Sequence, residues 1–132
     1  MKIVHISGKR KRAIARATIR DGTGIVRINK INLENFYPRI LRMKLMEPLI
    51  LSEDMANNVN IDVTVTGGGI SGQADAARLA IARSLAEYSK NDKLRNVFLK
   101  YDRHLLVADV RMPEPSKPND SKPRAKRQKS YR

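Results

Sequence analysis

Residues 59–90 read VNIDVTVTGGGISGQADAARLAIARSLAEYSK, and this stretch determines the fold class. Apolar and polar side chains alternate over residues 59–66, which predicts a β-strand that is buried on one face. Three glycines then lead into an alanine-rich helix predicted from Gln73 to Lys90. At 100° per residue, one face of this helix carries Ala74, Ala77, Ile81, Leu85 and Tyr88. A half-buried strand followed by a one-faced helix indicates a sheet with a helix packed on it.

The first third of the chain predicts further strands. A first strand, Ile3–Ile6, precedes a Ser7-Gly8 break, and residues 13–20 alternate small apolar side chains with arginines. Residues 21–24 read Asp-Gly-Thr-Gly, which predicts a hairpin turn followed by a returning strand over residues 25–28.

The middle of the chain and the residues after the long helix predict three more elements. Pro38 opens a helix that continues to Met46 and ends at Glu47-Pro48. A further helix is predicted over residues 92–100, and an apolar strand over residues 105–108.

The predicted elements assemble into one α+β domain with an extension. We expect a two-layer sandwich, a four-stranded sheet with helices on one face, formed by a globular body of residues 1–110. From Met112 onward, prolines and cations predict an extended, basic C-terminal tail, residues 111–132.

The formal net charge of +14 is concentrated at the two ends of the chain. Residues 1–20 contribute +7 and residues 111–132 contribute +6, whereas the long middle segment is nearly neutral. The last eleven residues carry six Lys/Arg, no acid and one large apolar side chain, Tyr131. Such a segment cannot build a core and is typical of an arm that binds a polyanion. A tail that only increases solubility is the alternative.

The composition argues against several kinds of site. The chain has no cysteine, so it has neither a disulfide nor a cysteine-ligated zinc site. His5 and His104 are far apart and have no partner at ligand spacing, so no metal is predicted. Because no long apolar stretch is present, we expect a cytoplasmic protein without a membrane span. No catalytic carboxylate pair or nucleophile motif stands out, so we expect neither an enzyme nor a cofactor.

The glycine-rich turn, Gly67–Gly69, is the one stretch that suggests a nucleotide site. A strand, a glycine turn and a helix N-terminus together can present backbone N–H groups to a phosphate. A nucleotide P-loop also needs a lysine and a hydroxyl, but Gln73 and Ala74 stand at those positions. Two interpretations remain: the glycines supply left-handed backbone and close packing, or the helix mouth holds a phosphate of RNA.

Polyanion binding is supported by a second cluster. Lys9-Arg10-Lys11-Arg12 lies at a chain bend, where the side chains can spread over several phosphates. The alternative for this quartet is a solvated charge run. A DNA-binding protein is the competing class, but it should show a recognition helix rich in Arg, Lys, Asn or Gln. The helix 73–90 is instead rich in alanine and places acids near its two arginines.

With these residues in view, the whole chain resembles protein nine of the small ribosomal subunit (the S-nine family), in its archaeal and eukaryotic branch. Four segments carry the resemblance: SGKRKRAIARA at residues 7–17, GGGISGQA at residues 67–74, KYDR at residues 100–103, and KPRAKRQKSYR at residues 122–132. The resemblance implies a fold that a group of small-molecule kinases shares, which makes such a kinase the second alternative. It also implies a place in the head of the small subunit, on ribosomal RNA and beside neighbouring ribosomal proteins.

The resemblance further implies that the tail approaches the transfer RNA in the peptidyl site. Ribosomal RNA contact is expected of Lys9, Arg10, Lys11, Arg12, Arg16, Gly67, Gly68, Gly69, Lys122, Arg124, Lys126, Arg127 and Lys129. Transfer RNA contact is expected of Ser130, Tyr131 and Arg132 at the end of the tail. The chain departs from the family pattern at Asn29-Lys30-Ile31, which lacks the glycine often found in that turn, and at residues 111–117, which are less basic than in relatives.

Overall fold

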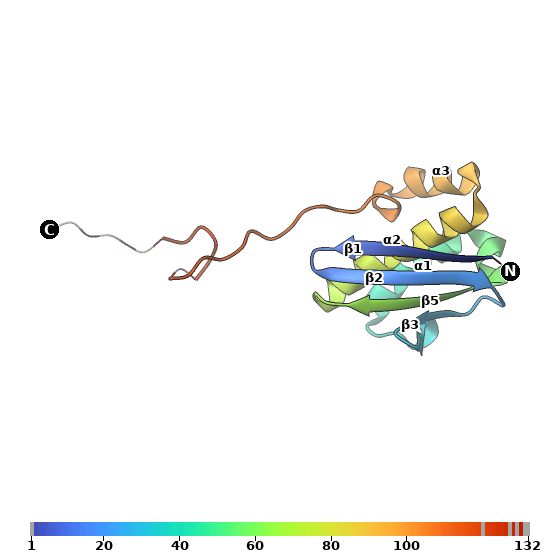
Figure 1. Ribbon diagram of the computed structural model, residues 1–132, viewed down its shortest axis with the longest axis horizontal. Coiled ribbons are helices and arrows are strands. Elements are labelled where there is room, and N and C mark those ends of the chain that lie inside the picture. Colours follow the sequence, from blue (N-terminus) through green and yellow to red (C-terminus); the bar gives the residue numbers. More distant parts are fainter. Residues whose placement is uncertain (1, 120, 127, 129, 131–132) are drawn as a thin grey trace.

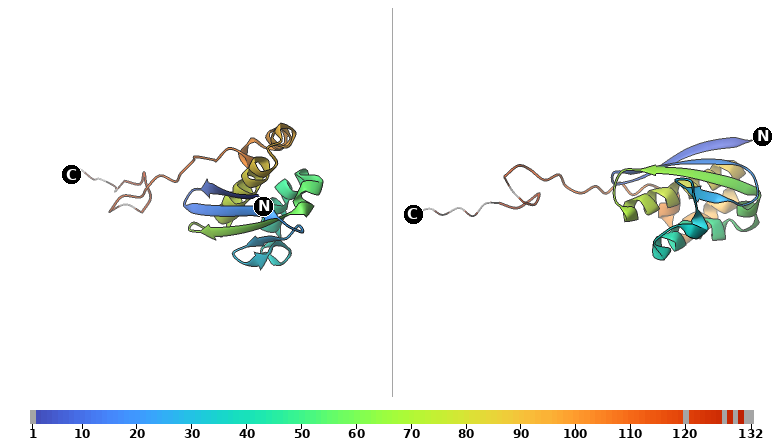
Figure 2. Two further views of the ribbon diagram at one scale, coloured as in Figure 1. Left: turned by 45° about the vertical axis from the view of Figure 1, so that its right-hand side comes forward. Right: turned by 90° about the horizontal axis from the view of Figure 1, so that it is seen from below.

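The computed structural model describes residues 2–119, 121–126, 128 and 130. A five-stranded sheet has the strand order β1-β2-β5-β3-β4, and the helices cover one of its faces (Figures 1 and 2). The strands are β1 (Ile3–Arg10), β2 (Ala13–Asp21), β3 (Val26–Ile28), β4 (Ile31–Asn32) and β5 (Val59–Thr66). The helices are α1 (Arg39–Leu51), α2 (Ile70–Ser89) and α3 (Asp92–Tyr101), with short 3₁₀ turns at Leu33–Asn35, Glu53–Asn58 and Arg103–Leu105. The predicted α+β sandwich is confirmed, and the fifth strand is the two-residue β4.

The core lies between α2 and the strands β2 and β5. The inward residues of both strands are buried, and so are the predicted helix residues Ala77, Ile81 and Leu85, while Tyr88 packs at the margin. Alanines on β2 and α2 let the helix approach the sheet closely, because a methyl group is all that separates the two backbones. The predicted strand 59–66 and the predicted packing face of the long helix are confirmed.

The predicted break at Ser7-Gly8 is wrong, because β1 continues through Arg10. Gly8 is a paired residue of the strand, opposite Ala15. A Cβ at Gly8 would lie 2.8 Å from the backbone nitrogen of Ala80 on α2. The glycine therefore permits close packing of β1 on α2. The chain turns instead at Lys11 and Arg12, between β1 and β2, and Lys11 has a φ of +53°.

The predicted hairpin at residues 21–24 is also wrong. β2 and β3 do not pair with each other, because β5 lies between them, antiparallel to β2 and parallel to β3. Residues 22–25 cross over the start of β5, where the side-chain oxygen of Asn60 accepts hydrogen bonds from the backbone N–H groups of Thr23 (3.0 Å) and Ile25 (3.1 Å). The Asp-Gly signal marks a chain crossing here, and not a hairpin.

Two predictions for the chain after β4 differ from the structure. α1 does not end at Pro48 but continues to Leu51. Pro48 is a residue within the helix, and its side chain is buried. The apolar run 105–108 forms no strand. Arg83 of α2 donates hydrogen bonds to the carbonyl oxygens of Leu106 (2.9 Å) and of Ser7 on β1 (3.3 Å). A guanidinium therefore bridges this run to the edge of the sheet in place of strand pairing.

The turn at Asn29-Lys30 joins β3 to β4 without a glycine. Both residues have positive φ, +50° and +70°, as tight hairpin turns require. Asn29 tolerates this conformation and is held by β5, because its side-chain oxygen accepts a hydrogen bond of 2.8 Å from the N–H of Val65. The departure from the family pattern at this turn is thus accommodated by an asparagine.

Candidate nucleic-acid interface

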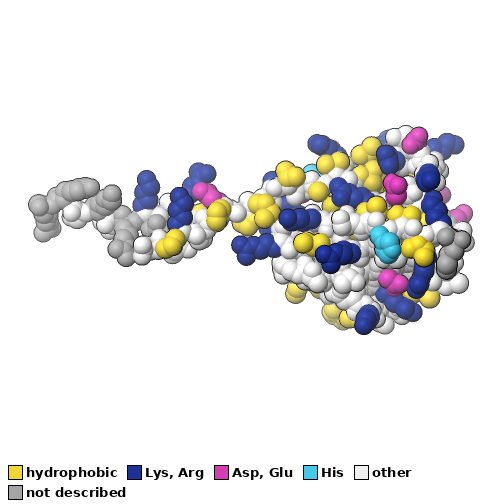
Figure 3. Space-filling view, in the orientation of Figure 1, with side chains coloured by type: hydrophobic (Ala, Val, Ile, Leu, Met, Phe, Trp, Pro, Cys, Tyr) yellow, Lys and Arg dark blue, Asp and Glu magenta, His cyan; other side chains and the backbone are white. Residues whose placement is uncertain are grey.

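The basic β1–β2 turn and the root of the basic tail meet at one end of the body. The β1–β2 turn, the loop Gly67–Gly69 and the start of the tail all lie at the side from which the tail extends (Figure 1). Lysine and arginine side chains lie at this end and along the tail, as well as over the rest of the visible face of the body (Figure 3). Lys9, Lys11 and Arg12 are exposed there. This arrangement creates one positive surface, which we call the hairpin end, from segments that are about a hundred residues apart in the chain.

The first two loop glycines are required by backbone geometry. Gly67 has a φ of +78° and Gly68 a φ of +64°, a region that side chains other than glycine rarely adopt. A Cβ at Gly67 would lie 2.6 Å from the carbonyl oxygen of Arg12, and a Cβ at Gly68 would lie 2.9 Å from the nitrogen of Ala13. The left-handed, close-packed interpretation therefore holds for these two glycines, and it brings the loop against the β1–β2 turn.

The N-terminus of α2 is open beside this loop. A Cβ at Gly69 would meet no atom of the described residues within 4 Å, and Gly69 caps the helix without a side-chain hydrogen bond. Gln73 donates a hydrogen bond of 3.0 Å to the carbonyl oxygen of Gly67, so it closes the loop where a P-loop lysine would reach a nucleotide. The first N–H groups of α2 thus face outward beside Lys11 and Arg12, an arrangement that suits a phosphate of a polyanion.

The outer face of the sheet extends the basic surface. No described helix covers this face (Figure 2). Arg16 is exposed on it, in register with Ser7 and Thr64 of the neighbouring strands. Arg20 lies further along β2, but its charge is engaged by Asp62 at 3.3 Å. Arg27 and Lys30 line a hollow beside Asp62. No sequence motif pointed to them, because they stand singly in the nearly neutral middle of the chain.

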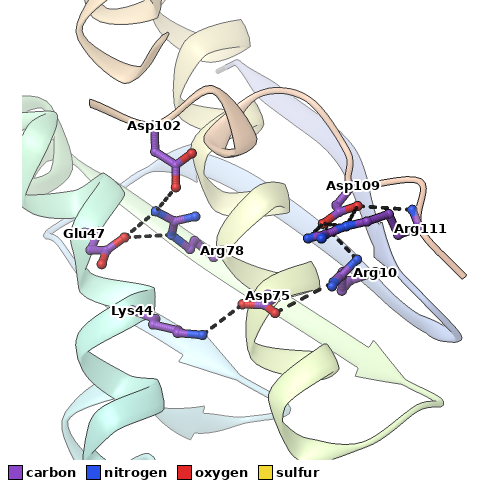
Figure 4. Close-up of polar contacts among 8 residues, drawn as sticks. All are labelled: Arg10, Lys44, Glu47, Asp75, Arg78, Asp102, Asp109 and Arg111. Atoms are coloured by element: carbon purple, nitrogen blue, oxygen red, sulfur yellow. Dashed lines mark hydrogen bonds and ion pairs between the residues drawn. The ribbon is translucent and has the colours of Figure 1, made fainter. Parts of the chain in front are cut away.

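Arg10 differs from the other three residues of the basic quartet, because its side chain points toward the helices. Only 18% of that side chain is exposed. Its Nη1 lies 3.0 Å from Asp109 Oδ2, and its Nε lies 4.0 Å from Asp75 Oδ2 (Figure 4). Lys44 of α1 is 3.4 Å from the other oxygen of Asp75. Arg10 is therefore engaged by carboxylates within the molecule, which it shares with Lys44 and Arg111, whereas Lys9, Lys11 and Arg12 are exposed at the surface.

Asp109 joins the root of the tail to the hairpin. Besides the ion pair with Arg10, its carboxylate accepts hydrogen bonds from the backbone N–H of Arg111 (3.1 Å) and from the Arg111 guanidinium (2.6 to 3.1 Å). The Arg111 side chain, then its backbone N–H, and the charge of Arg10 hold the pKa of this carboxyl well below its usual range. We call this group the Asp109 clasp. It brings together two segments whose cations would otherwise repel each other.

A second ion-pair group fastens the three helices to one another. Arg78 of α2 contacts Glu47 of α1, to which its Nε donates at 2.8 Å, and Asp102 after α3 at 3.1 Å (Figure 4). Burial raises the pKa of Asp102, but hydrogen bonds from the His104 N–H and from Arg78 outweigh it and lower the pKa overall. Arg78 is thus a structural residue that holds the helical layer together.

The tail residues divide between those that the structure describes and those that it does not. Lys122, Arg124, Lys126 and Ser130 are described and exposed, and Arg124 makes a surface ion pair of 2.9 Å with Glu114. Arg127, Lys129, Tyr131 and Arg132 lie outside the described residues.

Comparison with known proteins gives consistent matches over the full chain. The sequence profile of the family described as "Ribosomal protein S9/S16" matches residues 8–132. The chain is 52% identical, over 134 residues that cover 100% of both sequences, to the protein named "Small ribosomal subunit protein uS9" of Methanococcus maripaludis strain C7. It is 51% identical, with the same coverage, to the protein of that name from Methanococcus vannielii.

Proposed function

Because the chain belongs to the ribosomal protein S9/S16 family, we propose that its hairpin end docks on ribosomal RNA in the head of the small subunit, and that its tail continues to the transfer RNA in the peptidyl site. The family consists of structural proteins and not of enzymes. The chain is accordingly a structural constituent of the small ribosomal subunit, in the cytoplasmic ribosome, with ribosomal RNA and other ribosomal proteins as its partners.

One observation carries the proposal: the basic β1–β2 turn and the root of the basic tail lie at the same end of the body. A polyanion that contacts Lys11 and Arg12 also meets the open N-terminus of α2 and the root of the tail. The contact then continues from the body into the tail. This arrangement suits a protein that binds one RNA with its body and a second RNA with its tail.

The helical layer argues against the competing class, a DNA-binding protein. α2 buries its apolar face against the sheet, and its two arginines are occupied, Arg78 by carboxylates and Arg83 by backbone carbonyl groups. No arginine of this helix is therefore free to read base edges in a groove of duplex DNA.

The first test reverses charge at the hairpin end. We expect Lys11→Glu together with Arg12→Glu to weaken binding to purified small-subunit ribosomal RNA. The slope of log K against log salt concentration should fall by roughly 0.7–0.9 for each phosphate that the variant no longer neutralises. Lys93→Glu with Arg95→Glu, an equal charge change on exposed positions of α3, is the matched control. Equal losses of affinity in both variants would mean that only net charge matters, and would contradict docking through the hairpin end.

The second test removes residues 122–132. Folding and incorporation into the small subunit should survive, because the segment has no apolar face and the hairpin end remains. Transfer RNA in the peptidyl site should dissociate faster, and the salt dependence of its binding should fall by about one to three units if one to three cations contact its phosphates. The measurement is transfer RNA dissociation from purified small subunits at several salt concentrations. An unchanged rate and slope would leave the tail as an anchor on ribosomal RNA alone.

A further inference from the structure

Helix α1 exposes large apolar side chains on the side opposite its buried face. Leu41 and Leu45 are buried against the rest of the body. On the opposite side, Ile40, Met43 and Ile50 are 74%, 58% and 66% exposed. Each of these exposed apolar side chains forgoes the free energy of leaving water. The outer face of α1 is therefore built for a contact that the isolated chain does not make.

A groove runs beside this face and continues the apolar surface. It lies between α1 and the β3–β4 edge of the sheet, has a volume of about 620 Å³, and is lined by Ile25, Val26, Leu33, Met43, Met46 and Leu49 among others. Met43 and Met46 contribute flexible, polarizable side chains, which adapt to the shape of an incoming apolar group. Ile31 and Tyr37, close in sequence to the lining residues, are exposed as well. Exposed apolar surface of this extent marks an interaction site.

The charges at the groove define what kind of segment fits it. Arg39 and Arg42 line one end, and no carboxylate of the described residues lies within ion-pair distance of either guanidinium. Arg42 donates a hydrogen bond of 2.6 Å to the backbone carbonyl of Glu34, which leaves its charge uncompensated. The first turn of α1 holds no acidic residue, and its N-cap is Pro38, which offers no side-chain hydrogen bond. Glu34 also lines the groove, and no ion pair of the described residues joins its carboxylate to either arginine. Two arginines and the helix dipole against one carboxylate leave this part of the groove positive.

We propose that this groove docks an amphipathic segment of another small-subunit protein. Its apolar side chains, spaced as on one face of a helix, fill the groove along Met43 and Met46, and a carboxylate at one end pairs with Arg39 and Arg42. RNA does not fit, because the groove floor offers apolar groups to a ligand whose affinity comes from phosphates. A second copy of this chain fits poorly, because it would bring the same uncompensated arginines to the contact. The inference rests on membership of the small subunit, and not on the RNA contacts proposed above.

A photo-crosslinking residue placed at Met43 tests the occupant. Small subunits are purified from cells that express the tagged, full-length variant, irradiated, and the crosslinked product is mapped by mass spectrometry. We expect a peptide of another ribosomal protein with apolar side chains at helical spacing and an Asp or Glu at one end. The same crosslinker at Val97, which is 42% exposed on α3, is the control and should not yield that peptide. A crosslink to ribosomal RNA, to a second copy, to a segment without a carboxylate, or to nothing would overturn the proposal.

Binding of the mapped segment as a synthetic peptide separates docking from assembly. Fluorescence anisotropy with the free, folded chain should show a loss of affinity of about tenfold or more for Met43→Asp, as expected of a central apolar contact. Arg39→Glu should weaken binding in a salt-dependent manner, and a peptide with Lys in place of its acid should recover affinity for that variant. Val97→Asp should bind as the unchanged chain does. Equal affinity of all three variants would contradict the groove as the site.

Discussion

Gly68 and Gly69 stand side by side in the sequence but carry different constraints. Gly68 combines a positive φ with close contact to the backbone of Ala13, whereas Gly69 has extended backbone and open space where a side chain would be. The sequence shows three equivalent glycines, and only the structure distinguishes the ones that the fold requires from the one that leaves the mouth of α2 open.

The difference between these glycines predicts different costs of substitution. Gly68→Ala should lower the free energy of unfolding by about 2–4 kcal/mol, since the left-handed conformation alone costs an alanine roughly 1–2 kcal/mol and the contact with Ala13 adds to it. Gly69→Ala should change it by less than about 0.5 kcal/mol. Urea unfolding followed by circular dichroism measures both. Similar losses in the two variants would show that the loop relaxes around a side chain at Gly68.

At the scale of elements, β5 organises the sheet. It lies between β2 and β3, and its Asn60 holds the crossing segment that connects them. The crossing residues pair only with β5 and the turn before it: Gly22 donates to the carbonyl of Asn58, and Gly24 to that of Val59. The connection between β2 and β3 is thus stabilised by residues that come more than thirty positions later in the chain.

Removing the side-chain oxygen of Asn60 should loosen this crossing. Asn60→Ala leaves two backbone N–H groups without their acceptor, so we expect a loss of about 1–2 kcal/mol in the free energy of unfolding. Thr64→Ala, on the outer face of the same strand, is the control and should have little effect. Amide hydrogen exchange at Thr23 and Ile25 should accelerate in Asn60→Ala alone; unchanged exchange there would mean that Asn60 does not hold the segment.

At the scale of the whole molecule, the Asp109 clasp decides where the tail begins. It places a carboxylate with 15% side-chain exposure between Arg10 of β1 and Arg111 of the tail. Without it, Arg10 and Arg111 would face each other without a carboxylate between them, and like charges at short range repel. We therefore expect this acidic residue, together with the Arg83 contact to Leu106, to set the direction in which the tail leaves the body.

Asp109→Asn should broaden the position of the tail relative to the body. The chain has no cysteine, so spin labels can be attached to cysteines introduced at Ser71 and Ser116, and their distance distribution measured by electron spin resonance. We expect a narrow distance distribution in the protein with the native clasp and a broad one in Asp109→Asn. The double variant Arg10→Asp with Asp109→Arg should give a distribution narrower than that of Asp109→Asn. Equal widths in all three would show that the clasp does not orient the tail.

The clasp should also depend on pH in a defined direction. The pKa of Asp109 is lowered in the folded protein, so its contribution to stability is complete above the ordinary carboxyl range and is lost only as the pH falls through the lowered value. The distance distribution should therefore stay narrow from neutral pH down to about pH 4, the ordinary pKa of an aspartate. Broadening that is already complete above that pH would contradict the lowered pKa.

Much of the local structure and the class of function could be read from the sequence. Alternation over residues 59–66 and the one-faced pattern of α2 indicated a strand, a helix and the face on which each packs, because these depend on residues a few positions apart. The charge at the chain ends, with the segments that resemble the S-nine family, indicated a ribosomal protein, and the family matches confirm it.

The strand order and the orientation of Arg10 were decided by tertiary structure alone. An Asp-Gly turn predicts a hairpin only if its flanking strands pair, and here β5, from much later in the chain, pairs with both of them instead. In the same way, Arg10 reads as one of four equivalent cations, but Asp75 and Asp109 draw it inward. Strand pairing and ion pairing join residues that are distant in the chain. A short window of sequence contains only one of the two partners, so it cannot predict the pairing.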